Sequence, residues 1–364
     1  MARRTVHLHV GLPGTGGDIV PAALARHAEA LRAQGICAPA GADEMLRATL
    51  EITRDHRAHG LRRRDVEGSW AAICRRAQRE RGPVVLGHEL LAAATPEQVA
   101  LLLDGLAGFE VHVLLTATDP ASQLAAGWRR TLAAGGATSY ARFRRRVLDP
   151  ARDHPQAREF WAAHDLTAVA ARWAAALGDP RRVHVVVPPA GAHDPRPAIW
   201  QTLGELVGFE PLALPHDEMA LDEVAAAVAR GLNDALDGRL GSVEHRQAVA
   251  HYLGDAAWSG PRAVPTAAAY ADLRAIALLW SRQVTASGYA VIGDLADLSP
   301  AEPAGNGAEQ GPALEDVLAR TTDALADLVV ETTRLRQRAA ELEARNRSLE
   351  TRRLRLAPRL TRAS

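Results

Sequence analysis

The sequence contains no lysine, so all 43 of its basic side chains are arginines. It carries 43 acidic side chains as well, which gives a formal net charge of zero and a pI near 7.3. Proteins that bind nucleic acid usually have a basic domain, so this balance disfavours nucleic-acid binding. The absence of lysine also means that no lysine elsewhere in the chain can help to bind a phosphate or sulfate group.

Long apolar runs and cysteine motifs are scarce too. No stretch of about eighteen apolar residues occurs, which disfavours a membrane-spanning helix. The apolar run after Arg4 is short and contains His7 and His9, so we interpret it as a strand, with both imidazoles in the core, and not as a signal peptide. Cys37 and Cys74 form no metal-binding or redox motif and are predicted to be core residues. These features predict a cytoplasmic protein without a metal or a membrane anchor.

A glycine-rich stretch follows this first strand. Gly11-Leu12-Pro13-Gly14-Thr15-Gly16-Gly17-Asp18 lies between the apolar run and a helical pattern from Ile19 to Gln34. A strand, a glycine-rich loop and a helix N-terminus together cradle phosphate groups. The glycine spacing matches G-x-x-x-x-G-K-[ST], but Gly17 and Asp18 replace the lysine and the hydroxyl residue, which disfavours a P-loop kinase or nucleotidase. Asp18 is expected to cap the helix with its carboxylate and so to fill the loop.

Apolar runs and helical patterns alternate over the first 190 residues. The runs Pro83–Gly87, Phe109–Thr116 and Val183–Val187 predict buried strands, and the alternation predicts an α/β fold with a P-loop-type, doubly wound parallel sheet. The α/β domain is expected over 1–298, with 198–298 as a mostly helical cap. Helices are predicted over 43–81, after the Thr95 capping box, from Asp119-Pro120 to Ala134, over 138–148 and over 166–177.

The chain after a Pro/Gly-rich linker at 299–312 has a different pattern. Apolar residues alternate three and four apart over 313–353, with leucine at most d positions and Asn346 at an a position. This heptad repeat predicts a C-terminal coiled-coil helix, a homodimer through 313–353 and a basic tail at 354–364. The alternative is one long helix that lies back on its own domain. The seam consists of Leu314, Leu318, Thr321, Leu325, Leu328, Thr332, Leu335, Ala339, Leu342, Asn346 and Leu349.

Three segments of the α/β region resemble the bacterial sulfotransferase family, especially the variants common in actinobacteria. Leu12–Asp18 is similar to the family's Leu-Pro-Lys-Thr-Gly-Thr-Thr loop, Val85–Leu91 to the end of its next strand, and Thr116–Trp128 to its Arg-Asp-Pro…Ser region. The resemblance covers residues 5–298. It implies a donor, 3′-phosphoadenosine 5′-phosphosulfate, and transfer of its sulfuryl group to a hydroxyl or amine of a small molecule. His88 or Glu89 would take the acceptor's proton.

Three positions depart from the family's pattern. Gly14 stands in place of the loop lysine, Thr118 in place of the arginine on the 3′-phosphate, and Ala126 in place of the serine. A hydrogen bond to a charged group contributes about 1.5–3 kcal/mol, so donor binding is expected to be weaker by several kcal/mol. The resemblance places the donor against Pro13, Gly14, Thr15, Gly16, Gly17, Asp18, Thr118 and Ala126.

Two readings of these departures stay open at this point. Arginines near the second phosphate region can replace the lost contacts, because a guanidinium binds phosphate through two hydrogen bonds; the candidates are Arg129, Arg130, Arg142 and Arg145. Alternatively, the protein is a catalytically degenerate member of the fold that acts as a dimeric scaffold or regulatory protein.

Overall fold

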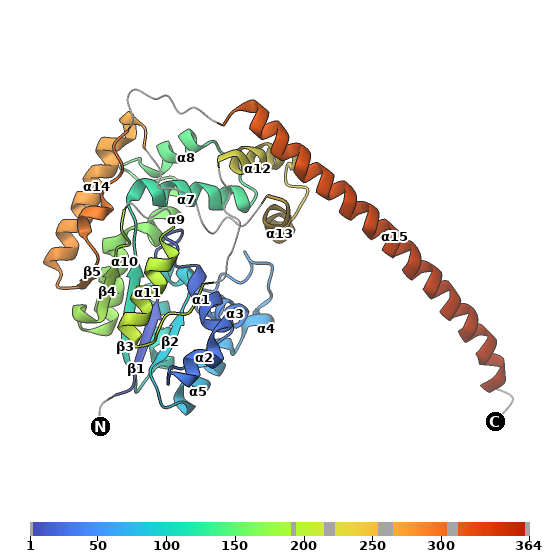
Figure 1. Cartoon of the computed structure of the whole chain (residues 1–364), viewed down its shortest axis with the longest axis horizontal. Coiled ribbons are helices and arrows are strands. Elements are labelled where there is room, and N and C mark those ends of the chain that lie inside the picture. The colour runs from blue at the N-terminus through green and yellow to red at the C-terminus, as the bar shows by residue number, and fades with distance from the viewer. Residues whose placement is uncertain (1–2, 191–193, 215–222, 254–264, 304–311, 361–364) are drawn as a thin grey trace. The chain divides into compact units, whose positions relative to one another are not determined.

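The structure, a computed structural model, describes residues 3–190, 194–214, 223–253, 265–303 and 312–360. It divides into two units, Met1–Gly311 and Pro312–Ser364, which are described separately (Figure 1). Most of the predicted linker lies outside the described residues. None of the described helices is long and apolar enough to cross a membrane.

The first unit is built on five parallel strands in the order β2-β1-β3-β4-β5. The four predicted strands are confirmed. The region 198–298, which was expected to be mostly helical, also contributes three residues that pair with β4 as a fifth strand. The strands are β1 (Thr5–His9), β2 (Val84–Gly87), β3 (Glu110–Thr116), β4 (Val183–Val186) and β5 (Ala290–Ile292).

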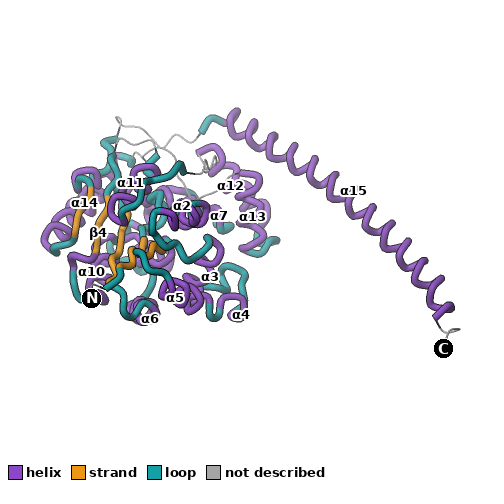
Figure 2. Tube along the Cα trace, turned by 60° about the horizontal axis from the view of Figure 1, so that its bottom comes forward, coloured by secondary structure: helices purple, strands orange, loops and turns teal. Residues whose placement is uncertain are grey.

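Helices cover both faces of the sheet because the side chains of each strand alternate between the faces. On β1, Val6 and Leu8 belong to the larger core, which also contains Trp173 and Trp280, whereas His7 and His9 point to the opposite face. Figure 2 shows the strands enclosed by helices. The larger core packs against α3 (Ala42–Thr53), α5 (Ser69–Arg79), α6 (Pro96–Gly105), α9 (Pro155–His164), α10 (Leu166–Leu177) and α14 (Ala267–Ala286). The opposite face packs against α1 (Ile19–Arg26), α2 (Ala28–Ala33) and α11 (Arg196–Val207).

Two predicted helices are broken. The first is interrupted at His27, between α1 and α2. The prediction over 43–81 was wrong in its middle, because Arg54 and Gly68 adopt left-handed backbone angles, with φ of 61° and 85°, that a helix cannot include. The Thr95 capping box is confirmed: Thr95 Oγ1 accepts from Gln98 N at 3.3 Å, and Gln98 Oε1 accepts from Thr95 N at 2.9 Å. The remaining helices of this unit are α4 (Arg63–Val66), α7 (Pro120–Ala133), α8 (Tyr140–Val147), α12 (Glu223–Leu236) and α13 (Ser242–Leu253).

The second unit is the single helix α15 (Leu314–Leu360). It continues beyond residue 353, where the coiled coil was predicted to end, so the predicted basic tail begins as part of the helix. The leucines of its seam are exposed.

Candidate functional site

The glycine-rich loop lies where the strand order of the sheet reverses. The chain places β2 on one side of β1 and β3 on the other, and ligands of open parallel sheets bind at the carboxyl ends of the strands beside such a reversal. Three backbone bonds hold the loop against β3: Val10 N and Gly11 N donate to Leu114 O at 2.9 and 3.3 Å, and Leu12 N donates to Thr116 O at 2.9 Å. The predicted loop therefore stands at the position in the fold where α/β proteins bind anions.

Glycine is required at several loop positions for different reasons. Gly14 and Gly16 have φ of 74° and 91°, in the left-handed region that favours glycine. Gly17 is needed for space, because a Cβ there would lie 2.3 Å from His9 Cε1. No hydrogen bond joins the N–H of Gly16 or Gly17 to another residue in the described parts of the chain. The N–H groups of Gly16 and Gly17, which come just before α1, thus have no hydrogen-bond partner among the described residues, and both glycines are buried.

The side chain of Thr15 holds the loop against the end of β3. Its side chain is fully buried, and its hydroxyl lies 2.7 Å from Leu12 O and 2.9 Å from Thr116 Oγ1. The Thr116 hydroxyl in turn lies 3.3 Å from His9 Nε2. These contacts fix the loop to the ends of β1 and β3, and they use the Thr15 hydroxyl inside the protein.

A buried carboxylate, that of Glu89, bonds to the backbone of the loop at Gly14. Glu89 begins the short 3-10 helix Glu89–Ala93 after β2, and only 6% of it is exposed. Its Oε2 accepts from the N–H of Gly14 at 3.2 Å, and its Oε1 forms an ion pair with Arg130 of α7. Burial alone would raise the pKa of Glu89, but the Arg130 guanidinium and the hydrogen bonds hold that pKa below its usual range. Glu89 is therefore an ionised carboxylate that binds the phosphate-type loop.

The expectation for Asp18 was wrong in this respect. Asp18 directly precedes α1, but its side chain makes no capping hydrogen bond. The carboxylate that bonds to the loop belongs to Glu89, which is 75 residues from Gly14 in the sequence. No local pattern connects the two residues, so the sequence could not have shown this pair.

His88 lies beside Glu89 and is a hydrogen-bond donor. Its Nδ1 accepts from Leu90 N at 3.2 Å, so the neutral ring carries its proton on Nε2. Burial, followed by the nearby charge of Arg130, lowers the pKa of His88 to about 4, with Glu89 acting in the opposite direction. At neutral pH, Nε2 therefore offers a proton and does not accept one.

The residue types at Gly14 and Ala126 have one steric explanation, because the two positions lie next to each other. A Cβ on Gly14 would lie 2.5 Å from the Cβ of Ala126, which is buried in α7. The loop therefore excludes any side chain at position 14 while α7 keeps its place, and the structure brings these two predicted residues together. Thr118 stands at the other end of this region, after β3. Its Oγ1 is buried and bonds to no described residue.

The candidate arginines take different positions. Arg130 reaches the loop through Glu89, Arg129 is buried in α7, and Arg142 and Arg145 are exposed on α8. Arg196, which the sequence did not single out, packs its Cγ 3.3 Å from where a Cβ of Gly16 would lie, and pairs with Asp194 at 2.9 Å. Arg130 is thus linked to the loop at Gly14 through Glu89, and Arg196 packs against the loop at Gly16.

His164 lies close to Arg130 in the protein interior. Its ring stacks on Phe160 with centroids 4.1 Å apart, and its Nδ1 lies 3.3 Å from Gln123 Oε1. Burial, with Arg130 adding to it, lowers the pKa of His164 to about 3. The imidazole is therefore neutral, and it tolerates the neighbouring guanidinium for that reason.

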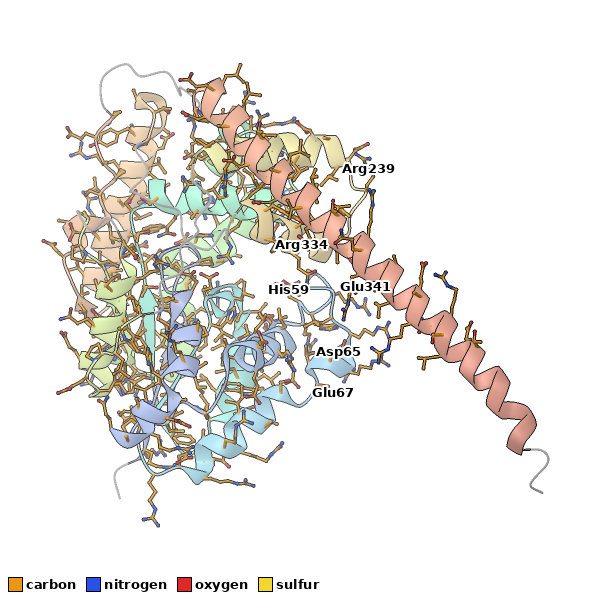
Figure 3. All side chains as sticks on the ribbon, turned by 45° about the vertical axis from the view of Figure 1, so that its right-hand side comes forward. His59, Asp65, Glu67, Arg239, Arg334 and Glu341 are labelled. Carbon is orange, nitrogen blue, oxygen red and sulfur yellow. The ribbon has the colours of Figure 1, made fainter. Side chains whose placement is uncertain are left out.

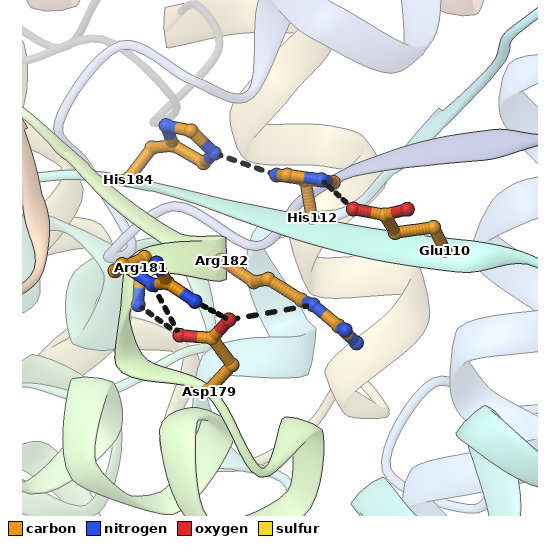
Figure 4. A network of polar contacts seen from close by, with 6 residues as sticks. All are labelled: Glu110, His112, Asp179, Arg181, Arg182 and His184. Carbon is orange, nitrogen blue, oxygen red and sulfur yellow. Dashed lines mark hydrogen bonds and ion pairs between the residues drawn. The ribbon is translucent and has the colours of Figure 1, made fainter. Parts of the chain in front are cut away.

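A second histidine group lies nearer the strand beginnings, and Figure 4 shows part of it. His112 Nδ1 lies 2.9 Å from His184 Nε2, Glu110 Oε1 lies 3.3 Å from His112 Nε2, and His7 stacks on His112. His7 and His9 share one face of β1, as predicted, and His7 is 8% exposed. Among the described residues, no group of three or more His, Cys, Asp or Glu side chains could hold a metal ion.

Comparisons with known proteins give one similarity. No protein-family model matches the sequence. No curated protein matches it either. Among solved structures, the chain is similar to the crystal structure of a sulfotransferase from Alicyclobacillus acidocaldarius, with a TM-score of 0.40 and 15% identity over 69% of this chain and 97% of the other.

Placing a lysine in the loop as Gly14→Lys is expected to lower the free energy of unfolding by at least 2 kcal/mol, roughly the sum of the costs of a left-handed side chain and of an overpacked contact with Ala126. Gly178→Lys is the matched control, because Gly178 has a φ of 70° but nothing within 4 Å of its Cβ position. Urea denaturation should show the larger loss for Gly14→Lys. Equal losses would mean that Ala126 does not restrict the loop.

Proposed function

We propose that this protein is a sulfotransferase that transfers the sulfuryl group of 3′-phosphoadenosine 5′-phosphosulfate to a hydroxyl or amine of a small molecule. The observation that carries the proposal is the ion pair of Glu89 and Arg130 on the N–H of Gly14, at the strand reversal where anions bind. An anion site, a cation to neutralise the anion and a carboxylate to accept a proton thus lie within one cluster.

The described residues fit the two charged ends of this donor to different degrees. At the phosphosulfate end, the N–H groups of Gly16 and Gly17 and the guanidinium of Arg130 suit an anion. At the 3′-phosphate end, the buried Thr118 hydroxyl can donate one hydrogen bond. A neutral hydroxyl binds phosphate less strongly than an arginine does, so we expect weaker donor binding than a complete pair of charged contacts would give.

In this reaction the acceptor oxygen or nitrogen forms a bond to sulfur, the bond from sulfur to the bridging phosphate oxygen breaks, and the acceptor loses a proton. Glu89 would receive that proton. Its pKa is lowered mainly by Arg130 against the opposing effect of burial, so a second anion that draws Arg130 away would leave burial to raise the pKa. Glu89 would then become a better base when the donor binds. His88 Nε2 would donate a hydrogen bond within the same site.

The non-catalytic alternative rests on the same contact. Glu89 occupies the N–H of Gly14, and a loop bonded to its own carboxylate binds other anions less well. In that case the protein keeps the fold and acts through association with other chains. The two functions differ in whether the donor's desulfated product, 3′-phosphoadenosine 5′-phosphate, binds.

Calorimetric titration with this product is the test. We expect saturable binding by the full-length protein, and binding about tenfold tighter for Glu89→Gln, because a neutral amide competes less than a carboxylate for Gly14 and Arg130. Transfer by Glu89→Gln should fall by about 100-fold or more, since the base is gone.

Exposed Glu97, on the first turn of α6, provides the control variant Glu97→Gln, which should change neither quantity. Absence of heat at millimolar product for both the native protein and Glu89→Gln would contradict the transferase proposal and leave the non-catalytic alternative.

A further inference from the structure

Helix α15 carries a row of seam residues in which leucine predominates, and these leucines are exposed. At the seam positions, Leu318 and Leu325 are 57% and 56% exposed, and Leu335 and Leu342 are 61% and 48% exposed. Single exposed leucines are ordinary, but a row that repeats every three and four residues along one helix is an interaction surface. The remaining leucines of the row, Leu314, Leu328 and Leu349, are between 44% and 73% exposed.

We propose that α15 pairs with α15 of a second copy of this chain in a parallel, in-register, two-stranded coiled coil over residues 314–351. In this arrangement each a and d side chain packs against its counterpart on the partner helix. The proposal does not depend on the transferase function. The leucine row of one chain packs against the same row of the second copy.

The charges that flank the row agree with this choice. In a parallel dimer, each g residue faces the e residue five positions later on the partner helix. Glu331 would thus face Arg336 of the partner, Arg338 would face Glu343 of the partner, and Arg345 would face Glu350 of the partner. All three pairs have opposite charges, and the two-fold axis repeats each one. A shift of the register by one heptad would bring Glu331 opposite Glu343 and so place like charges together.

Asn346 distinguishes the parallel from the antiparallel arrangement. It occupies an a position, and parallel in-register packing brings it opposite Asn346 of the partner, where the two amides can hydrogen-bond. Antiparallel packing layers a positions against d positions, which are leucines everywhere except Thr321 in the described seam. A buried amide against leucine lacks a partner and costs about 1–3 kcal/mol.

Many of the side chains outside the row are charged. Figure 3 labels Arg334 and Glu341, which stand at c positions one heptad apart and therefore on one side of the helix. Arg338 forms an ion pair with Glu341 of the same helix at 3.6 Å. Charged side chains thus occupy much of the helix surface outside the row, and Val329 and Val330, which are 57% and 49% exposed, are apolar exceptions there.

The oligomeric state of the full-length protein tests the seam. Sedimentation velocity should give twice the 38.9 kDa chain mass for the native protein. Leu335→Glu combined with Leu342→Glu should give monomers, whereas Thr333→Glu combined with Ala340→Glu, which adds the same charges one heptad apart at b positions, should leave dimers. A native monomer would mean that the row packs on its own chain, and a dimer of the double leucine variant would place the interface elsewhere. Either result overturns the proposal.

A cross-link tests the orientation. Leu314→Cys lies at the first d position, and parallel pairing brings the two introduced thiols together, so mild oxidation should give a disulfide-linked dimer on a non-reducing gel. In an antiparallel pair the same residues would be about 55 Å apart, from a rise of 1.5 Å per residue. The native Cys37 and Cys74 are buried in the first unit and provide the background control. A dimer that fails to cross-link would overturn the parallel arrangement.

Discussion

Replacing Arg130 with alanine is expected to lower the free energy of unfolding by about 3 kcal/mol and to abolish binding of 3′-phosphoadenosine 5′-phosphate. The first effect follows because Glu89 would stay buried without its counter-ion, and breaking a buried pair from one side is strongly destabilising. The second follows because Arg130 is the cation that pairs with the carboxylate on the loop. Urea denaturation followed by tryptophan fluorescence reports the first unit alone, since all seven tryptophans precede residue 312.

Two further variants separate the causes of these effects. Arg142→Ala removes an exposed arginine of the same region and should change stability by no more than about 0.5 kcal/mol. Arg130→Ala combined with Glu89→Ala should recover much of the lost stability, because it removes the uncompensated charge, but it should not restore binding. If Arg130→Ala alone kept native stability and native binding, the ion pair would not be part of the anion site.

We expect the first unit to unfold in acid at a pH above that at which most of its carboxylates become protonated. Burial lowers the pKa of His9 to about 4 and that of His164 to about 3, whereas both titrate near 6.5 in an unfolded chain. Between pH 6.5 and 4 the unfolded state binds more protons than the folded state, so stability is fully present above pH 6.5 and falls as the pH drops. The loss is about 3 kcal/mol for each of these histidines.

His164→Gln isolates one of the two contributions. Glutamine keeps a polar group near Gln123 but does not titrate, so the slope of unfolding free energy against pH should decrease by about 1.4 kcal/mol per pH unit between pH 6 and 4. An unchanged slope in His164→Gln would show that His164 is not held neutral in the fold.

The parts of the fold that rest on local pattern could be predicted from the sequence. Four of the five strands are apolar runs with β-branched residues, which is typical of strands buried on both faces. The exception, β5, has only three residues and gets its hydrogen bonds from β4, so its own sequence carries little information. The break at Arg54 was missed for a related reason, because an arginine with a left-handed φ has no sequence signature.

The sequence could show where the candidate site lies in the chain, but not which distant residues come into contact there. The glycine spacing indicated the loop, and the apolar run before it indicated that the loop follows a strand. The contacts that define its chemistry join residues far apart in the chain: Glu89 to Gly14, Arg130 to Glu89, and Ala126 against Gly14. The steric reason why position 14 has no side chain is visible only once α7 is placed beside the loop.

The most direct test of the proposed anion site is a crystal structure of the protein with 3′-phosphoadenosine 5′-phosphate. We predict the 5′-phosphate on the N–H groups of Gly16 and Gly17, the Arg130 guanidinium turned towards it, and the Glu89 carboxylate moved off the N–H of Gly14. A structure in which the nucleotide binds elsewhere, while Glu89 still bonds to Gly14 and Arg130, would contradict the account.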